Sequence, residues 1–378
     1  MIERLIIQGF KSIRGQYIEL DRLNVLIGPN ASGKSNLISF LRMLGAMASR
    51  HLESYVFHSG GIDALLFGGQ EVTPAMHFEV CLQNPATPHL TNCWKASLEA
   101  AGDHYRVANE WYGFHDQARY QKPYWEQVPE NGSRTESALP DVTDPQARNT
   151  LDRLAAFRVY HFHDTSDNAP VKRPSDFEDV RELKPEAENL AAVLYFLKKE
   201  YPHVYRDIRT HVKLIYKQFD DFVLEESPWA KGKVVLQWRE QGSSYVFGPR
   251  QISDGTLRFI SLATLLLQPP PDEPPGLVPH TVILDEPELG LHPFAITVLA
   301  EMLQKAAVDR QIVVATQSTT LLDHFSPEEV IVAERKSVPE VGLAETVFKR
   351  LDAQQLASWL EEYDLGQLWE KNVLGGRP

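Results

Sequence analysis

The sequence lacks several features that would place it in a special class of protein. It has only two cysteines in 378 residues, too few for a disulfide framework or a four-cysteine zinc site. No apolar run approaches the ~18 residues that a membrane-spanning helix needs. The first residues, Met1-Ile-Glu-Arg-Leu-Ile-Ile, have the pattern of a strand and not of a signal peptide. We therefore expect a cytoplasmic protein, in a reducing compartment, that does not enter a membrane.

Positive charge is also scarce, because 38 Lys and Arg face 51 Asp and Glu, for a formal net charge of −13. This balance excludes a uniformly basic nucleic-acid coat, but it allows a local basic groove. Basic residues interleaved with tyrosines are enriched between 170 and 220, where a solvated helix face and a DNA groove are both consistent with the pattern. These residues are Lys172, Arg173, Lys198, Lys199, Arg206, Arg209, Lys213 and Lys217.

The first motif that the sequence contains is a glycine-rich loop. Gly28-Pro-Asn-Ala-Ser-Gly33-Lys34-Ser35 fits the pattern G-x-x-x-x-G-K-[ST], with an apolar strand pattern over 23–27 before it. Such a loop turns its backbone N–H groups toward phosphates at the positive end of the next helix. Lys34 supplies a cation to the β- and γ-phosphates, and Ser35 a hydroxyl to Mg²⁺. We expect ATP and Mg²⁺ here, with the nucleotide bound by Gly28, Asn30, Gly33, Lys34, Ser35 and Asn36.

A helix is predicted directly after this loop. Apolar residues recur there at intervals of three and four, which is the period of one helix face. They are Leu37, Ile38, Leu41, Leu44 and Met47.

The second motif is an apolar strand that ends in acids, Thr281-Val-Ile-Leu-Asp285-Glu286. The carboxyl end of such a strand faces the ligand crevice of an open α/β sheet. Many strands end in an acidic turn, but together with the loop the pattern favours a role for both acids. Asp285 would support the metal, and Glu286 would polarise the attacking water as a general base. We expect Glu288 to be a solvated or helix-capping acid, and Pro293 to begin a helix.

The third motif is Ile252-Ser253-Asp254-Gly255-Thr256-Leu257-Arg258, followed by an apolar helix. The Ser253 hydroxyl, the Gly255 amide and the helix N-terminus offer donors to an anion, although a helix merely capped by serine has the same pattern. Here the sequence resembles ABC-class ATPases, whose signature reads L-S-x-G-x-x-R/Q. The resemblance implies that Ser253 and Gly255 contact ATP held by a partner subunit, within a homodimer or higher oligomer that encloses the nucleotide.

Further segments narrow the resemblance. Gly9-Phe10-Lys11-Ser12 is similar to the start of SMC, RecF and OLD-type ATPase heads. Segments 159–166 and 188–194 resemble compact bacterial ATPases of the RecF/OLD-like group, predicted to be of the AAA type. The resemblance covers most of 1–82 and 153–348 and implies a role in defence or repair. It also implies an effector partner such as a nuclease or toxin, and DNA as a candidate ligand. No heptad long enough for an SMC arm is present, so we expect a head without a coiled coil.

The sequence departs from this group at the strand after the acids. A histidine usually follows that strand as a γ-phosphate switch, whereas here Ile312-Val-Val-Ala-Thr316 leads to Gln317. Gln317 can bond a phosphate or water but cannot become cationic; we assign it the switch role, with an ordinary strand-end glutamine as the alternative. Gln70 is a weak candidate for the Mg²⁺-sensing glutamine. Lys11 is consistent with either a nucleotide contact or a solvated turn.

His161, His163 and Asp164 form an H-x-H-D pattern that fits a metal site, since alternate residues of a strand share a face. No second group of ligands is close in sequence. We therefore favour a hydrogen-bonded structural cluster for these three residues.

The predicted fold is α/β. It is a P-loop ABC-type ATPase head with an N-terminal antiparallel β-subdomain and an inserted helical and irregular lobe. The expected segments are 1–84 with the phosphate loop, 85–245 as insertion and helical lobe, 246–350 with the signature and carboxylate strand, and 351–378 as a helical tail. The predicted function is ATP hydrolysis coupled to dimer closure and to DNA-linked work in anti-phage defence or repair. The alternative is a nucleotide-gated regulatory module that holds or releases a nuclease or toxin without acting on DNA.

Overall fold

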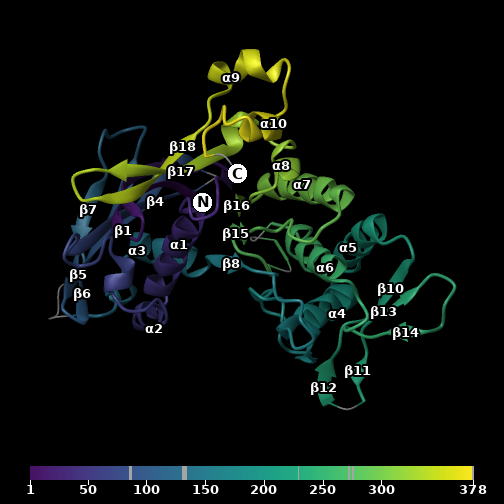
Figure 1. Ribbon diagram of the computed structural model, residues 1–378. Coiled ribbons are helices and arrows are strands. Elements are labelled where there is room, and N and C mark those ends of the chain that lie inside the picture. The colour runs from purple at the N-terminus through teal and green to yellow at the C-terminus, as the bar shows by residue number, and fades with distance from the viewer. Residues whose placement is uncertain (85–86, 130–133, 229, 271–272, 275, 377–378) are drawn as a thin grey trace. The chain divides into compact units, whose positions relative to one another are not determined.

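The computed structural model describes residues 1–84, 87–129, 134–228, 230–270, 273–274 and 276–376 (Figure 1). The chain divides into two compact units. Unit 1 joins Met1–Arg158 to Ser326–Pro378, and unit 2 is Val159–Phe325. This division differs from the four consecutive segments expected from the sequence, because the two ends of the chain fold together. None of the described helices is long and apolar enough to cross a membrane.

Unit 1 contains the predicted antiparallel β-subdomain, a sheet in the order β2-β1-β4-β5-β6-β7. The expectation of an irregular insertion after residue 84 is wrong over β5 and β6, which extend this sheet. Both strands contain Pro, Asn or Gly, which weaken the local strand signal. The pairing of β5 with β4 and of β6 with β5, together with the burial of Trp94 and Leu98 in β5, overrides it. The strands are β1 (Ile2–Phe10), β2 (Ile13–Glu19), β4 (Ala75–Asn84), β5 (Thr87–Ala101), β6 (His104–Asp116) and β7 (Tyr124–Gln127).

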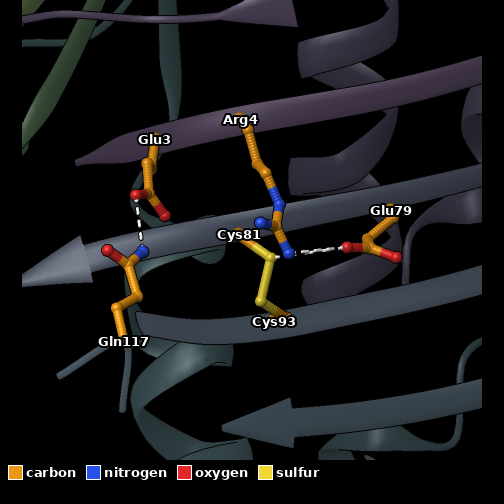
Figure 2. Close-up of a disulfide and its surroundings, with 6 residues drawn as sticks. All are labelled: Glu3, Arg4, Glu79, Cys81, Cys93 and Gln117. Carbon is orange, nitrogen blue, oxygen red and sulfur yellow. Dashed lines mark hydrogen bonds and ion pairs between the residues drawn. A yellow bond between two sulfur atoms is a disulfide. The ribbon is translucent and has the colours of Figure 1, made fainter. Parts of the chain in front are cut away.

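A disulfide joins β4 to β5 (Figure 2). Cys81 and Cys93 lie directly opposite each other in the strand register, with 4.1 Å between their Cα atoms, and both are fully buried. The carboxylate of Glu79 lies near both sulfurs and accepts a 3.0 Å bond from Arg4. Since a metal needs thiolates, the bonded sulfurs exclude a metal site here. The low cysteine count led us to expect a reducing compartment, which favours free thiols. The disulfide differs from that expectation.

The remainder of unit 1 carries the phosphate loop. β3 (Leu23–Ile27) runs parallel to β17 (Val330–Val338), which pairs antiparallel with β18 (Leu343–Arg350). The predicted helix is α1 (Lys34–Ala48), and all five residues of its apolar pattern are buried. Four further helices of this unit are α2 (Leu52–His58), α3 (Pro145–Ala155), α9 (Ala353–Leu360) and α10 (Leu365–Glu370).

Unit 2 is built on two parallel strands, β15 (Thr281–Asp285) and β16 (Gln311–Ala315), with Asp285 opposite Ala315. β8 (Arg158–Tyr160) lies beside β15. Since parallel strands end at the same edge, the residues after β15 and β16 meet there. The helices of unit 2 are α4 (Leu190–Glu200), α5 (Pro202–Ile215), α6 (Asp254–Leu266), α7 (Pro293–Ala307) and α8 (Thr319–Leu322).

Two small antiparallel sheets complete unit 2. One contains β10 (Phe219–Val223), β13 (Gln237–Glu240) and β14 (Val246–Phe247), and the other β9 (Ser175–Asp176), β11 (Glu226–Ser227) and β12 (Ala230–Val234).

Candidate functional site

The phosphate loop connects β3 to α1 and needs glycine at two positions. Gly28 has φ 151° and Gly33 has φ 108°, in the region that favours glycine. A Cβ atom on Gly33 would overlap the Thr346 hydroxyl, and one on Gly28 would overlap the backbone oxygen of Ala333. The loop is thus curled tightly between strands, as a backbone that wraps a phosphate must be.

A buried chain of polar groups supports the loop from behind. The Thr346 hydroxyl of β18 donates to the Ser32 backbone oxygen at 2.8 Å and lies 2.7 Å from Ser12 Oγ. Asn36 Nδ2 donates to the same Ser12 oxygen at 2.6 Å. The Asn36 side chain, predicted to bind nucleotide, is therefore used in supporting the loop. No motif predicted Thr346, since it lies more than 300 positions from the loop it supports.

Lys34 bends its ammonium over the loop. Its Nζ donates to the backbone oxygens of Gly28 at 2.5 Å and Pro29 at 3.2 Å. The predicted ligands Asn30 and Ser35 are exposed. Lys11 instead donates to Ser39 Oγ of α1 at 2.7 Å, and burial, reinforced by the charge of Arg42, lowers its pKa. The charge that faces the loop's concave backbone is therefore that of Lys34.

The carboxylates lie at the ends of β15 and β16 in unit 2. Glu286 has φ 45°, a left-handed conformation that is uncommon outside glycine. Its backbone N–H donates to the Ala315 oxygen at 2.7 Å. The Gln317 side-chain amide donates to the Glu286 carboxylate. The structure thus brings together the predicted general base and the predicted switch residue, beside Asp285.

Glu288 differs from its prediction. The expectation of a solvated or capping acid is wrong, since only 8% of Glu288 is exposed and the Thr316 hydroxyl donates to its carboxylate. The turn after Pro287 directs this side chain back toward the end of β16. The cap of α7 is His292, whose Nδ1 accepts a 3.3 Å bond from the Phe294 N–H, and Pro293 begins that helix as predicted.

The burial of Glu288 predicts a pH dependence of stability. Burial raises the pKa of its carboxyl above the ordinary value of 4.5. The stability that this group contributes is therefore present below pH 4.5 and is lost as the pH rises through the folded pKa. Glu288→Gln is neutral at every pH, so the variant should gain stability relative to wild type as the pH rises from about 5 to 8.

Thermal unfolding across that pH range checks this expectation. Glu301→Gln, at an exposed position of α7, is the control and should follow the wild type at each pH. A Glu288→Gln stability difference that is the same at every pH would contradict the prediction.

The signature residues lie at the start of α6. Ser253 Oγ accepts the Thr256 N–H at 3.3 Å, so the serine caps the helix. Ser253 and Asp254 are nevertheless exposed, and the first turn is open to a partner. A Cβ on Gly255 would lie 2.5 Å from the Gly290 oxygen, so close packing also explains this glycine.

Several basic residues expected for a DNA groove have partners inside unit 2. Lys198 pairs with Asp221 at 3.0 Å, and Arg209 with both Asp220 and Asp221 at 3.3 and 3.4 Å. Lys213 lies 3.6 Å from Asp220. These ion pairs neutralise much of the charge that a groove would present to phosphates.

His163 and Asp164 of the H-x-H-D pattern make hydrogen bonds, which is consistent with the structural cluster that we favoured from the sequence. His163 Nε2 lies 2.9 Å from the Asp285 backbone oxygen, and the Asp164 carboxylate accepts the Ser166 N–H at 3.0 Å. The Ser166 hydroxyl, together with this backbone N–H, lowers the pKa of the Asp164 carboxyl. Gln70, the weak magnesium-sensor candidate, is half-buried, and its backbone N–H donates to Asp63 at 2.8 Å.

Two models of protein families match parts of the chain. A family model described as "AAA domain, putative AbiEii toxin, Type IV TA system" matches residues 96–323, and one described as "AAA ATPase domain" matches residues 1–72. No curated protein matches the chain.

Two solved structures share the fold at 14% sequence identity. One is an SMC head bound to the C-winged helix domain of ScpA, with a TM-score of 0.60 over 94% of this chain and 99% of that chain. The other is an Smc head with an extended coiled coil bound to the C-terminal domain of ScpA, derived from Pyrococcus furiosus. Its TM-score is 0.54 over 96% of this chain and 98% of that chain. The predicted fold of an ABC-type ATPase head is therefore confirmed.

Proposed function

We propose that this protein binds and hydrolyses ATP. The chain belongs to the AAA-domain family whose description names a putative AbiEii toxin of a type IV toxin–antitoxin system. The observation that carries the proposal is the phosphate loop, whose two glycines adopt conformations and contacts that exclude a side chain. Such a concave run of backbone N–H groups fits the phosphates of a nucleotide. Lys34 adds a cation at its rim.

Further side chains of the sequence motifs are assigned the remaining functions. Mg²⁺, held by the Ser35 hydroxyl and supported by Asp285, would neutralise phosphate charge. The Glu286 carboxylate would take a proton from the attacking water, since it is the acid directly after the strand end. The Gln317 amide, bonded to Glu286, would orient that carboxylate and the water.

We further propose that two copies close around ATP through the exposed start of α6. Ser253 and the Gly255 amide would meet the nucleotide of the other copy. Both similar heads were solved with a bound ScpA domain, which supports a protein partner for this chain as well.

Two roles for the ATP cycle differ in their target. A DNA-acting enzyme in defence or repair needs free cations, whereas Lys198, Arg209 and Lys213 pair with acids of the same unit. This observation favours the second role, a nucleotide-gated module in the cytoplasm that holds or releases a nuclease or toxin. The family description, which names a toxin, supports the same role.

Nucleotide binding and phosphate release test the proposed activity. The wild type should bind ATP and release phosphate in the presence of Mg²⁺. Lys34→Ala should weaken ATP binding itself by about 10-fold or more, since a hydrogen-bonded charge worth ~1.5–3 kcal/mol is removed. Lys305→Ala, on α7, is the control and should bind ATP like wild type. Equal ATP affinity in Lys34→Ala and wild type would overturn the proposal.

A further inference from the structure

His163 belongs to the one sequence pattern that the proposed function leaves without a role. Its Nε2 lies 2.9 Å from the backbone oxygen of Asp285. A carbonyl oxygen only accepts, so Nε2 carries the hydrogen and donates. The ring therefore holds the last peptide of β15, immediately before Glu286.

That peptide group is fixed at both of its ends. Its C=O, from Asp285, accepts from His163, and its N–H, from Glu286, donates to the Ala315 oxygen at 2.7 Å. The orientation of this peptide plane sets the φ angle of Glu286, which is 45°. A left-handed conformation of a non-glycine residue persists only where its surroundings hold it. The direction of the Glu286 side chain thus depends on both bonds.

Arg258 of the signature helix holds His163 in turn. Its Nη2 donates to the His163 backbone oxygen at 2.9 Å and its Nε to that of Phe162 at 3.0 Å. The third nitrogen, Nη1, donates to the Leu289 oxygen at 2.7 Å, in the turn that follows the acids. One planar guanidinium therefore joins the backbone of Phe162 and His163 to the turn after Glu286. A lysine ammonium lacks the planar set of donors that these three bonds need.

We propose that His163 and Arg258 are positioning residues that orient Glu286 for proton transfer by fixing the Asp285–Glu286 peptide. The inference rests on the proposed function, since it concerns the base of that reaction. His163 and Arg258 line one small cavity with Tyr160, Asp285 and Glu286.

The test compares His163→Ala with His163→Gln. A small misplacement of a catalytic group slows chemistry by up to ~100-fold, so His163→Ala should lower kcat by about 10- to 100-fold. Its KM for ATP should stay within about twofold, because lower kcat at unchanged ground-state binding is the mark of lost alignment. His163→Gln should recover most of kcat, since its side-chain amide also donates to a carbonyl. Arg258→Lys should lower kcat in the same way as His163→Ala.

Two control variants remove a histidine and an arginine that make similar backbone contacts away from Glu286. His211 Nδ1 lies 2.8 Å from the Asp207 backbone oxygen, and Arg173 donates to the Asn168 oxygen at 2.9 and 2.7 Å. Both sets of hydrogen bonds are exposed, and His211→Ala and Arg173→Ala should turn over ATP like wild type.

The outcomes distinguish this inference from the proposed function. Wild-type kcat in a folded His163→Ala variant overturns the inference alone, as does an equal loss in the Ala and Gln variants. If His163→Ala does not fold, wild-type kcat in Arg258→Lys overturns it, and a selective loss of kcat there supports it. A wild-type protein that does not hydrolyse ATP overturns the proposed function and this inference with it.

Discussion

Glu286→Gln is expected to slow ATP hydrolysis by ~100-fold or more, the upper part of the range for a general base, while ATP binding stays nearly intact. Glutamine keeps the shape of the side chain, and its oxygen still accepts the bond from Gln317. It has no site that takes a proton from water at neutral pH. The groups proposed to hold phosphate lie in the loop 28–35 and are unchanged.

Single-turnover phosphate release and nucleotide titration measure the two effects separately. Glu301→Gln, at an exposed position of α7, is the matched control and should hydrolyse ATP like wild type. Equal single-turnover rates for Glu286→Gln and wild type would remove Glu286 from the role of base. A large loss of ATP affinity would show instead that Glu286 contributes to binding.

Ser253→Arg is expected to abolish ATP-dependent dimerisation altogether. The experiment uses the Glu286→Gln background, in which slow hydrolysis lets the ATP-bound form accumulate. Ser253 is exposed at the first turn of α6, so an arginine there should not disturb the core of unit 2. It should, however, occupy the space in which the helix start would meet the nucleotide of the other copy.

Size-exclusion chromatography with and without ATP and Mg²⁺ measures the assembly. Thr210→Arg places the same side chain at an exposed position of α5 and should leave the dimer intact. A Glu286→Gln protein that remains a monomer at saturating ATP contradicts the proposed closure of two copies. If the Ser253→Arg variant still dimerises with ATP, the proposal that Ser253 meets the nucleotide of the other copy is wrong.

Local patterns predicted the elements that carry the proposed chemistry. The loop after β3, the helix α1 and the strand β15 are each specified within about ten residues, through glycine placement, a helical period and a run of apolar residues. The same holds for Pro293, which begins α7 as predicted. Where a feature depends on neighbours in the chain, the sequence was sufficient.

Features that depend on distant partners were not predicted. β5 was missed because its strand identity comes from pairing with β4 and β6. Thr346 was missed because no local pattern marks a hydroxyl that supports a loop more than 300 positions away. Glu288 was assigned to solvent because its burial depends on a turn that directs it toward Thr316. The contact of His163 with Asp285 was missed for the same reason, because the two residues are 122 positions apart.

The discontinuity of unit 1 has a consequence for synthesis of the protein. Domains generally fold as units while the chain leaves the ribosome, N-terminal parts first. Unit 2, which is continuous, is complete once Phe325 has emerged, whereas unit 1 still lacks Ser326–Pro378. The loop over 28–33 then has neither Thr346 nor Ala333 against it. A nascent chain therefore carries its signature and acids before β17 and β18 support its phosphate loop.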